Sequence, residues 1–307
     1  MGMASQFYSM HALVLSVLKA GIFLTVLTLG FRAKFSDAAY MLWRPGDFGR
    51  VFLSMNVLMP LTALTLVLWF NLDPAVKIAL ATLSVSPVPP LFPKKSVRGH
   101  GRGDYSVGLL VAAAMPAIVV MPFTLKIFAP ITDVPLHLPT RSVATLVLAF
   151  IVAPLLIGLS ARRVVPSFAE RAARPVGALA AVLLGLAILP VLFVSGKAMV
   201  SLIGNGTLLS MTAFALMGLL WGYLLGGPDL ETKRALALAT ACRHPGVAIA
   251  IADENFPQQR LVVPAVGLYL IVITLLWAVV SWRRLRQGTG PAANEAHEQA
   301  IGGSQVS

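Results

Sequence analysis

The sequence predicts an all-α polytopic membrane protein with nine transmembrane segments, and three observations carry this prediction. Of its 307 residues, 57% are hydrophobic and only 12% are charged, which is about half the charged share of a soluble domain. Several apolar stretches approach or exceed the ~20 residues that a helix needs to cross a bilayer. The basic residues lie in short clusters between these stretches, a pattern that argues against a nucleic-acid-binding face or arm.

The apolar segments follow one another along the chain, and the loops between them are alternately rich and poor in basic residues. They cover residues 11–30, 49–70, 74–93, 104–128, 140–161, 174–196, 207–226, 232–253 and 260–282. Seventeen of the 24 Lys and Arg residues fall in the loops of one side, and four fall in those of the other. The positive-inside rule therefore predicts an integral protein of the cytoplasmic (inner) membrane, with the N-terminus outside and the C-terminus in the cytoplasm.

The third apolar segment is predicted to be interrupted. Four prolines follow one another closely in its second half: Pro87, Pro89, Pro90 and Pro93. The helix that begins at Pro74 is therefore expected to end near Ser86. Two interpretations of the next residues stay open. Either Lys94 and Lys95 begin a second half-helix, where cations are unfavourable unless an anion is bound, or the prolines complete the crossing as extended chain and the lysines belong to a cytoplasmic loop.

The eighth segment, 232–253, carries the letters CRHPG near its middle. Pro245 cannot donate to the carbonyl four residues earlier and Gly246 relaxes the backbone, so a second interrupted helix is predicted. Free N–H groups at the start of the second half attract anions, and Arg243 adds a charge with several donors. The alternative is a simple kink with Arg243 paired to a buried acid, but the acidic residues lie near segment ends. We therefore expect a negative substrate at this break.

Interrupted segments at corresponding places of two halves indicate an inverted-repeat secondary transporter, with its site where the breaks meet. The first repeat is predicted over 1–138, with four spans and its broken segment at about 74–100. The second covers 139–286, with five spans and its broken segment at about 232–253. The polar residues 287–307 are predicted to form a disordered cytoplasmic tail.

The expected substrate is a small organic anion, bound by polar and charged residues beside the two breaks. These residues are Arg243, His244, Lys94, Lys95, Gly246, Thr240 and Asn56. No catalytic group, cofactor or metal is expected, because no nucleophile, acid pair or metal-ligand cluster assembles at one depth. The single cysteine, Cys242, excludes a multi-cysteine metal site, and a small packed residue is its expected role.

Several short motifs, in this order and at these spacings, resemble the bile acid:sodium symporter family over nearly the whole chain. They are LTLGFRAKFSD, MNVLMPLTAL, RGDYSVGLLVAAAMPAIVVMPF and LALATACRHPGVAIAIA. The resemblance implies ten helices in two inverted repeats with two crossed, broken helices, and transport of organic anions that usually draws on the sodium gradient. Some members lack the first helix, which would account for nine spans here.

The chain departs from the family at the positions that the resemblance assigns to sodium. The family's Glu and Gln in the second broken helix correspond to Ala239 and Arg243, and its Ser-Asn pair at the first crossover corresponds to Lys94 and Lys95. Sodium needs several oxygen ligands, so fixed positive charge is expected to replace it. The sequence thus predicts a sodium-independent transporter, working by proton coupling, uniport or exchange. The alternatives are an ordinary sodium-coupled symporter and a receptor that binds a metabolite without moving it.

Overall fold

The computed structural model describes a helical membrane protein. It describes residues 2–41, 43–89, 103–128, 148–256 and 258–288, with the single residues 130 and 145, and no strand occurs among them. Within these ranges four stretches are long and apolar enough to cross a membrane: Pro45–Trp69, Thr207–Leu225, Leu230–Asp253 and Val262–Val279. The all-helical class is confirmed. The count of nine spans, the orientation and the boundaries of the two repeats stay predictions.

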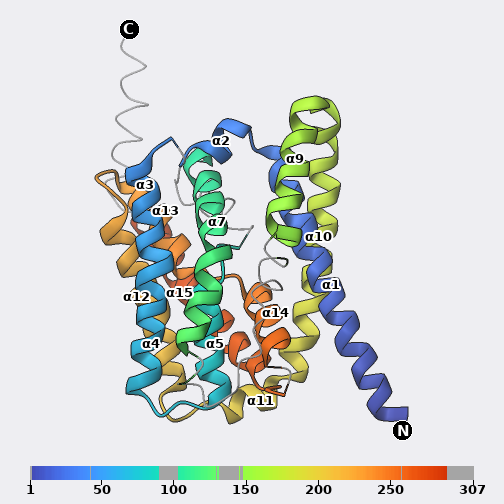
Figure 1. The fold of residues 1–307 in the computed structure, drawn as a ribbon, viewed down its shortest axis with the longest axis vertical. Helices are drawn as coiled ribbons and strands as arrows, with labels where there is room; N and C mark the ends of the chain where they lie inside the picture. Colours follow the sequence, from blue (N-terminus) through green and yellow to red (C-terminus); the bar gives the residue numbers. More distant parts are fainter. Residues whose placement is uncertain are drawn as a thin grey trace, which may run out of the picture.

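One group of helices consists of α1 (Gly2–Arg32), α9 (Ala153–Val164) and α10 (Pro166–Val194), which lie side by side in Figure 1. Glycines allow this close approach. A Cβ added to Gly158 would lie 2.8 Å from the Cα of Gly30, so the backbones of α1 and α9 touch where neither residue has a side chain. The π-helical segment η3 (Leu148–Val152) leads directly into α9.

A second group begins with one continuous stretch made of α3 (Pro45–Phe52), the π-helical segment η1 (Leu53–Leu58) and α4 (Met59–Trp69). The next members are α12 (Thr207–Leu225) and α13 (Leu230–Ala241), which pack closely against each other. A Cβ on Gly222 of α12 would lie 2.4 Å from the carbonyl oxygen of Leu236. The remaining long helices are α5 (Pro74–Val85), α7 (Gly103–Phe128), α14 (Pro245–Asn255) and α15 (Val262–Gly288).

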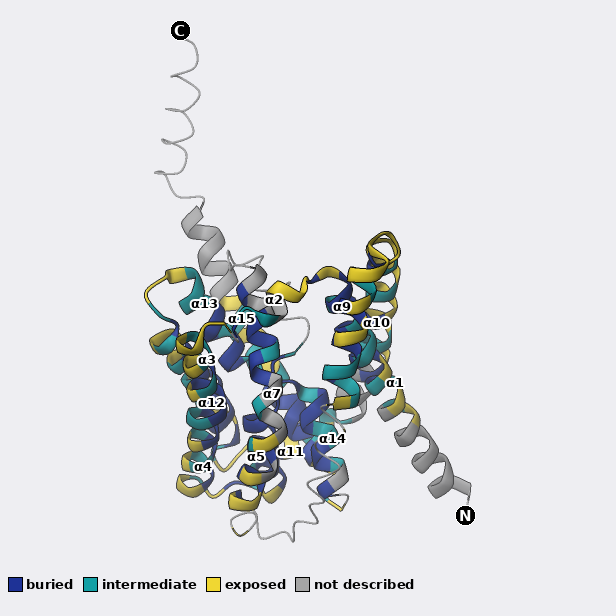
Figure 2. Cartoon of the chain, turned by 45° about the horizontal axis from the view of Figure 1, so that its top comes forward, coloured by how far each residue is buried: buried dark blue, intermediate teal, exposed yellow. Residues whose placement is uncertain are grey.

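The centre of the molecule is formed by α5 and by the broken stretch α13–α14. In the apolar window of Leu230–Asp253, 78% of the residues are buried, against 33% to 44% in the other three spanning stretches. The described residues of α5, and those of α13 and α14 from Ala235 to Ala252, are mostly buried, and Figure 2 draws the buried residues mainly in the interior between the helices. Helix α5 begins at Pro74, and the carboxylate of Asp73 caps it by accepting the N–H of Ala75 at 2.8 Å.

The predicted helix end near Ser86 and the predicted interruption before Pro245 both occur in the described residues, whereas the rest of the first broken segment stays a prediction. Helix α5 ends at Val85, and Ser86 is extended. Helix α13 ends at Ala241 and α14 begins at Pro245, with an extended backbone at Cys242 and His244 between them. Pro87 and Pro89 follow α5 in non-helical chain. Pro90, Pro93, Lys94 and Lys95 lie outside the described residues, so both interpretations of that stretch stay open.

Several helices extend beyond the apolar segments predicted for them. Helix α1 begins at Gly2, α10 begins at Pro166 and α15 runs to Gly288, whereas the predicted segments were 11–30, 174–196 and 260–282. Hydropathy marks only the part of a helix that lies in hydrocarbon, while backbone hydrogen bonds continue into the interface. Two short helices complete the description, α2 (Phe35–Ala39) and α11 (Gly196–Ser201).

Candidate functional site at the meeting of the two helix breaks

The two helix breaks meet inside the molecule through their backbones. The N–H of His244 donates to the carbonyl oxygen of Pro87 at 3.0 Å. His244 precedes α14 and Pro87 follows α5, so each group lies outside a helical ladder and needs a partner from elsewhere. This hydrogen bond joins the second break to the extended chain that directly follows α5.

Tyr269 of α15 holds the second break open. Its hydroxyl donates to the carbonyl oxygen of Ala241 and accepts the backbone N–H of Arg243 at 3.2 Å. In a continuous helix the Ala241 carbonyl would bond to residue 245, which is a proline and has no N–H. One fully buried hydroxyl thus satisfies two backbone groups that the break leaves free.

The guanidinium of Arg243 joins the break to two other elements. Its Nη1 donates to the carbonyl of Ser86 at 3.1 Å, and its Nη2 donates to the carbonyl of Met55 at 3.0 Å. The Ser86 carbonyl is free because α5 has ended. The Met55 carbonyl lies in η1, where the residue five positions later is Pro60, which has no N–H. The side chain of Arg243 is only 3% exposed, so these bonds form away from water.

Three buried nitrogen atoms at this site have no hydrogen-bond partner among the described residues: Asn56 Nδ2, Arg243 Nε and His244 Nε2. The imidazole Nδ1 of His244 accepts the N–H of Val247 at 3.3 Å. A neutral imidazole that accepts at Nδ1 carries its proton on Nε2. All three atoms are therefore donors, and an unmet buried donor is costly. No described residue gives these three donors an acceptor, and an anion would supply several acceptor oxygens.

The other predicted site residues differ in what they contact. Thr240 is fully buried and its hydroxyl donates to the Ser54 hydroxyl at 3.3 Å, so it joins α13 to η1. Gly246 lies in the first turn of α14 against α1, because an added Cβ would be 2.8 Å from Cδ1 of Ile22. The structure thus brings Arg243, His244 and Gly246 together beside the Met55–Asn56 backbone. It does not describe Lys94 and Lys95.

Two features of the site were missed by the sequence reasoning. Tyr269 lies within the last predicted apolar segment, and the signal that could have identified it is that a tyrosine there needs a partner for its hydroxyl. The π-helical turn η1 was not predicted either, although Pro60 in the middle of an apolar segment was a signal that a carbonyl one turn earlier would need another donor. The carbonyl partners of Arg243 left no sequence signal.

Apolar helices of spanning length, together with an interrupted helix that places polar groups inside the molecule, are typical of membrane transporters. The family model described as the Sodium Bile acid symporter family matches residues 19–203, more than half of the chain. The chain belongs to this family of membrane transport proteins. The match ends before α13, so the roles of Arg243 and Tyr269 rest on geometry. No curated protein has a sequence that matches this chain.

Proposed function

We propose that this chain carries a small organic anion across the membrane without sodium, and that the anion binds where the two helix breaks meet. The three unpartnered donors of Asn56, Arg243 and His244 carry the proposal. A carboxylate, sulfate or phosphate group offers acceptor oxygens to several donors at once. The partial positive charge at the start of α14, to which Gly246 belongs, acts in the same direction.

The sodium-independent part of the proposal rests on Arg243. The guanidinium takes up the carbonyl oxygens of Ser86 and Met55, and carbonyl oxygens are ligands that a hard cation such as sodium requires. The resemblance puts a sodium ligand of the family at this residue. A permanently charged side chain supplies the positive charge there instead, and it stays attached to the protein throughout the transport cycle. Lys94 and Lys95 are proposed to act in the same way.

Access to the site requires a change of conformation. His244 is 5% exposed, and Gly246 lies against Ile22 of α1. We propose that the group α1–α9–α10 separates from α14 to admit the anion, as alternating access requires. The donors would then be covered again once their acceptor is in place.

Thermal unfolding of the purified protein tests the binding step. The probes are small carboxylates, sulfates and phosphates in sodium and in choline buffer, for the wild type, Arg243→Ala and His244→Asn. Ligand at 100 times its Kd should stabilise the folded state by about 2.7 kcal/mol. We expect an equal shift in both buffers. The His244→Asn variant is the sharper one, because asparagine keeps a helix N-cap but removes the imidazole donor.

Counterflow of the same anion in proteoliposomes tests the transport step. Exchange of labelled for unlabelled anion in choline buffer is the expected result. Stabilisation by a ligand only in sodium buffer would favour the alternative, an ordinary sodium-coupled symporter. Binding without counterflow would mean a receptor. Unchanged binding in both Arg243→Ala and His244→Asn would show that the anion does not bind at the helix breaks.

A further inference from the structure

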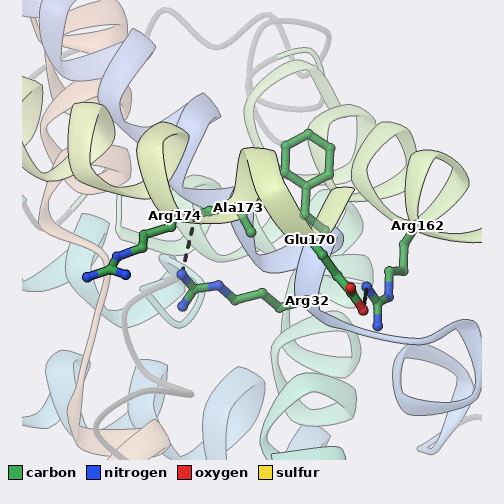
Figure 3. Close-up of a pocket in the computed structure, with 6 residues that line it drawn as sticks. Arg32, Arg162, Glu170, Ala173 and Arg174 are labelled. Atoms are coloured by element: carbon green, nitrogen blue, oxygen red, sulfur yellow. Dashed lines mark hydrogen bonds and ion pairs between the residues drawn. The ribbon is translucent and has the colours of Figure 1, made fainter. Parts of the chain in front are cut away.

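A basic pocket lies at the ends of α1, α9 and α10, away from the crossing helices. Its volume is about 230 Å³, and the residues that line it are Phe31, Arg32, Arg162, Glu170, Ala173 and Arg174 (Figure 3). Arg32 is the last residue of α1, Arg162 lies in the last turn of α9, and Arg174 lies near the start of α10. The charge bias of the loops assigns this end of the helices to the cytoplasm.

The charges of the pocket are not balanced among the described residues. Arg162 pairs with Glu170 at 2.6 Å, and Arg32 donates to the backbone carbonyl of Ala173 at 3.3 Å. Arg174 makes neither an ion pair nor a hydrogen bond with the part of the chain that the structure describes. Figure 3 shows the Arg162–Glu170 pair on one side of the pocket, and Arg32 and Arg174 on the other. Two guanidinium groups therefore face the pocket without a carboxylate.

Arg32 and Arg174 are both exposed, so water weakens the repulsion between their charges, and an anion between them would turn it into attraction. The guanidinium fork matches the oxygens of a phosphate group, and arginine is the usual residue where such groups are bound. The chemistry of the pocket thus fits a tetrahedral oxyanion, either free in solution or at the head of a lipid.

The surroundings of the pocket favour the lipid. Val164, Val165 and Phe168, at the turn from α9 to α10, are 77%, 48% and 57% exposed. The ring of Phe168 lies edge-on to that of Phe31, which lines the pocket, at 6.2 Å between centroids. Exposed apolar side chains at the end of a membrane helix contact acyl chains or the interface. Headgroup binding at Arg32 and Arg174 would thus be accompanied by apolar contact beside it.

We propose that this pocket binds the phosphate headgroup of an anionic phospholipid. Basic pockets between helices on the cytoplasmic side are suited to such lipids. The bound lipid would hold the group α1–α9–α10 at a fixed depth in the inner leaflet. The site is separate from the helix breaks, and it does not depend on the substrate or on the coupling ion.

Native mass spectrometry of the purified full-length protein tests the proposal. Phosphatidylglycerol and phosphatidylcholine are titrated separately, and inorganic phosphate forms a third arm. The variants are Arg174→Gln, the double change of Arg32→Gln with Arg174→Gln, and the control Arg171→Gln. Arg174 has no described partner to lose, so its variant should fold. Arg171 is an exposed arginine of the same helix that does not line the pocket.

We expect the wild type to prefer phosphatidylglycerol, and Arg174→Gln to weaken its binding about fivefold, from roughly 1 kcal/mol per basic residue near the membrane surface. The double variant should weaken it further, whereas Arg171→Gln should leave it unchanged. An equal loss of phosphatidylglycerol binding in Arg171→Gln would mean that the lipid is attracted by the basic surface in general, and it would overturn the pocket as the binding site. Equal binding of the two lipids, or binding of inorganic phosphate without phosphatidylglycerol, would overturn the lipid headgroup as the ligand.

Discussion

Replacing Tyr269 by phenylalanine should destabilise the protein without changing the shape of its core. The ring would keep its edge-on contact with Phe214, at 5.9 Å between centroids. The hydroxyl would be lost, and with it the donor for the Ala241 carbonyl and the acceptor for the Arg243 N–H. Both backbone groups would then be buried without the partner that they have now.

The size of the effect follows from these two groups. A buried polar group left without a partner costs about 1–3 kcal/mol, while hydrogen bonds between membrane helices have been measured nearer 0.6 kcal/mol each. A loss of about 2 kcal/mol is therefore expected for the pair. At an average unfolding entropy of about 2.1 cal/mol/K per residue, the Tm of a 307-residue chain shifts by about 1.5 °C per kcal/mol. The Tm should therefore fall by roughly 3 °C.

Thermal unfolding of the detergent-purified protein, without ligand, measures this loss. Tyr223→Phe is the matched control, because Tyr223 lies on α12 with 45% of its surface exposed. Surface substitutions of this kind change stability by about 0.5 kcal/mol or less. If Tyr269→Phe and Tyr223→Phe unfold at the same temperature, the hydroxyl does not hold the break, and the reasoning that links Pro245 to Tyr269 is refuted.

Three further predictions concern packing, capping and binding. Gly158→Ala should lower stability by about 1–3 kcal/mol in thermal unfolding, because its Cβ would meet the backbone of Gly30. The control Gly185→Ala should leave stability unchanged, because the space around Gly185 is open. Equal losses in the two variants would contradict the close contact between α1 and α9. Asp73→Ala should lower the free energy of unfolding by about 1 kcal/mol, because it removes the N-cap of α5, whereas Asp73→Asn should keep most of the capping. Equal Tm values for the two variants would refute the cap. Asn56→Leu should leave the Tm of the ligand-free protein within about 2 °C of the wild type, since the amide nitrogen has no partner to lose. The same variant should reduce the stabilisation by substrate anions. Unchanged stabilisation would exclude Asn56 from the site.

The helix breaks could be predicted from the sequence because their causes are local. A single proline can stay within a membrane helix, as Pro116 and Pro122 do in α7. Pro87 is followed by Pro89, and Pro245 by Gly246, and such combinations interrupt a helix more strongly. The observed helix ends at Val85 and Ala241 lie just before these combinations. The membrane class was equally accessible, because apolar stretches of spanning length have few other uses.

The partners of the buried arginine could not be predicted in the same way. No acidic residue was available at the depth of Arg243, and that absence led to the expectation of an anion. In the structure, two nitrogens of the Arg243 guanidinium instead donate hydrogen bonds to the carbonyl oxygens of Ser86 and Met55. Every residue carries a carbonyl, so a contact of this kind leaves no mark in the sequence. The unpartnered Nε was likewise visible only in three dimensions.

The attachment of Arg243 to backbone carbonyls has an electrical consequence. A sodium ion that binds and dissociates moves its charge across the membrane in each cycle, whereas a side-chain cation returns with the protein and contributes no net current. If Arg243 replaces sodium as proposed and the carrier is a uniporter, the only charge carried is that of the substrate itself. At 100 mV, inside negative, one elementary charge corresponds to about 2.3 kcal/mol, or roughly a 50-fold concentration ratio. An uncoupled carrier of a monovalent anion would therefore run toward the outside of the cell at rest, and an inward-working carrier would have to move a second charge together with its substrate.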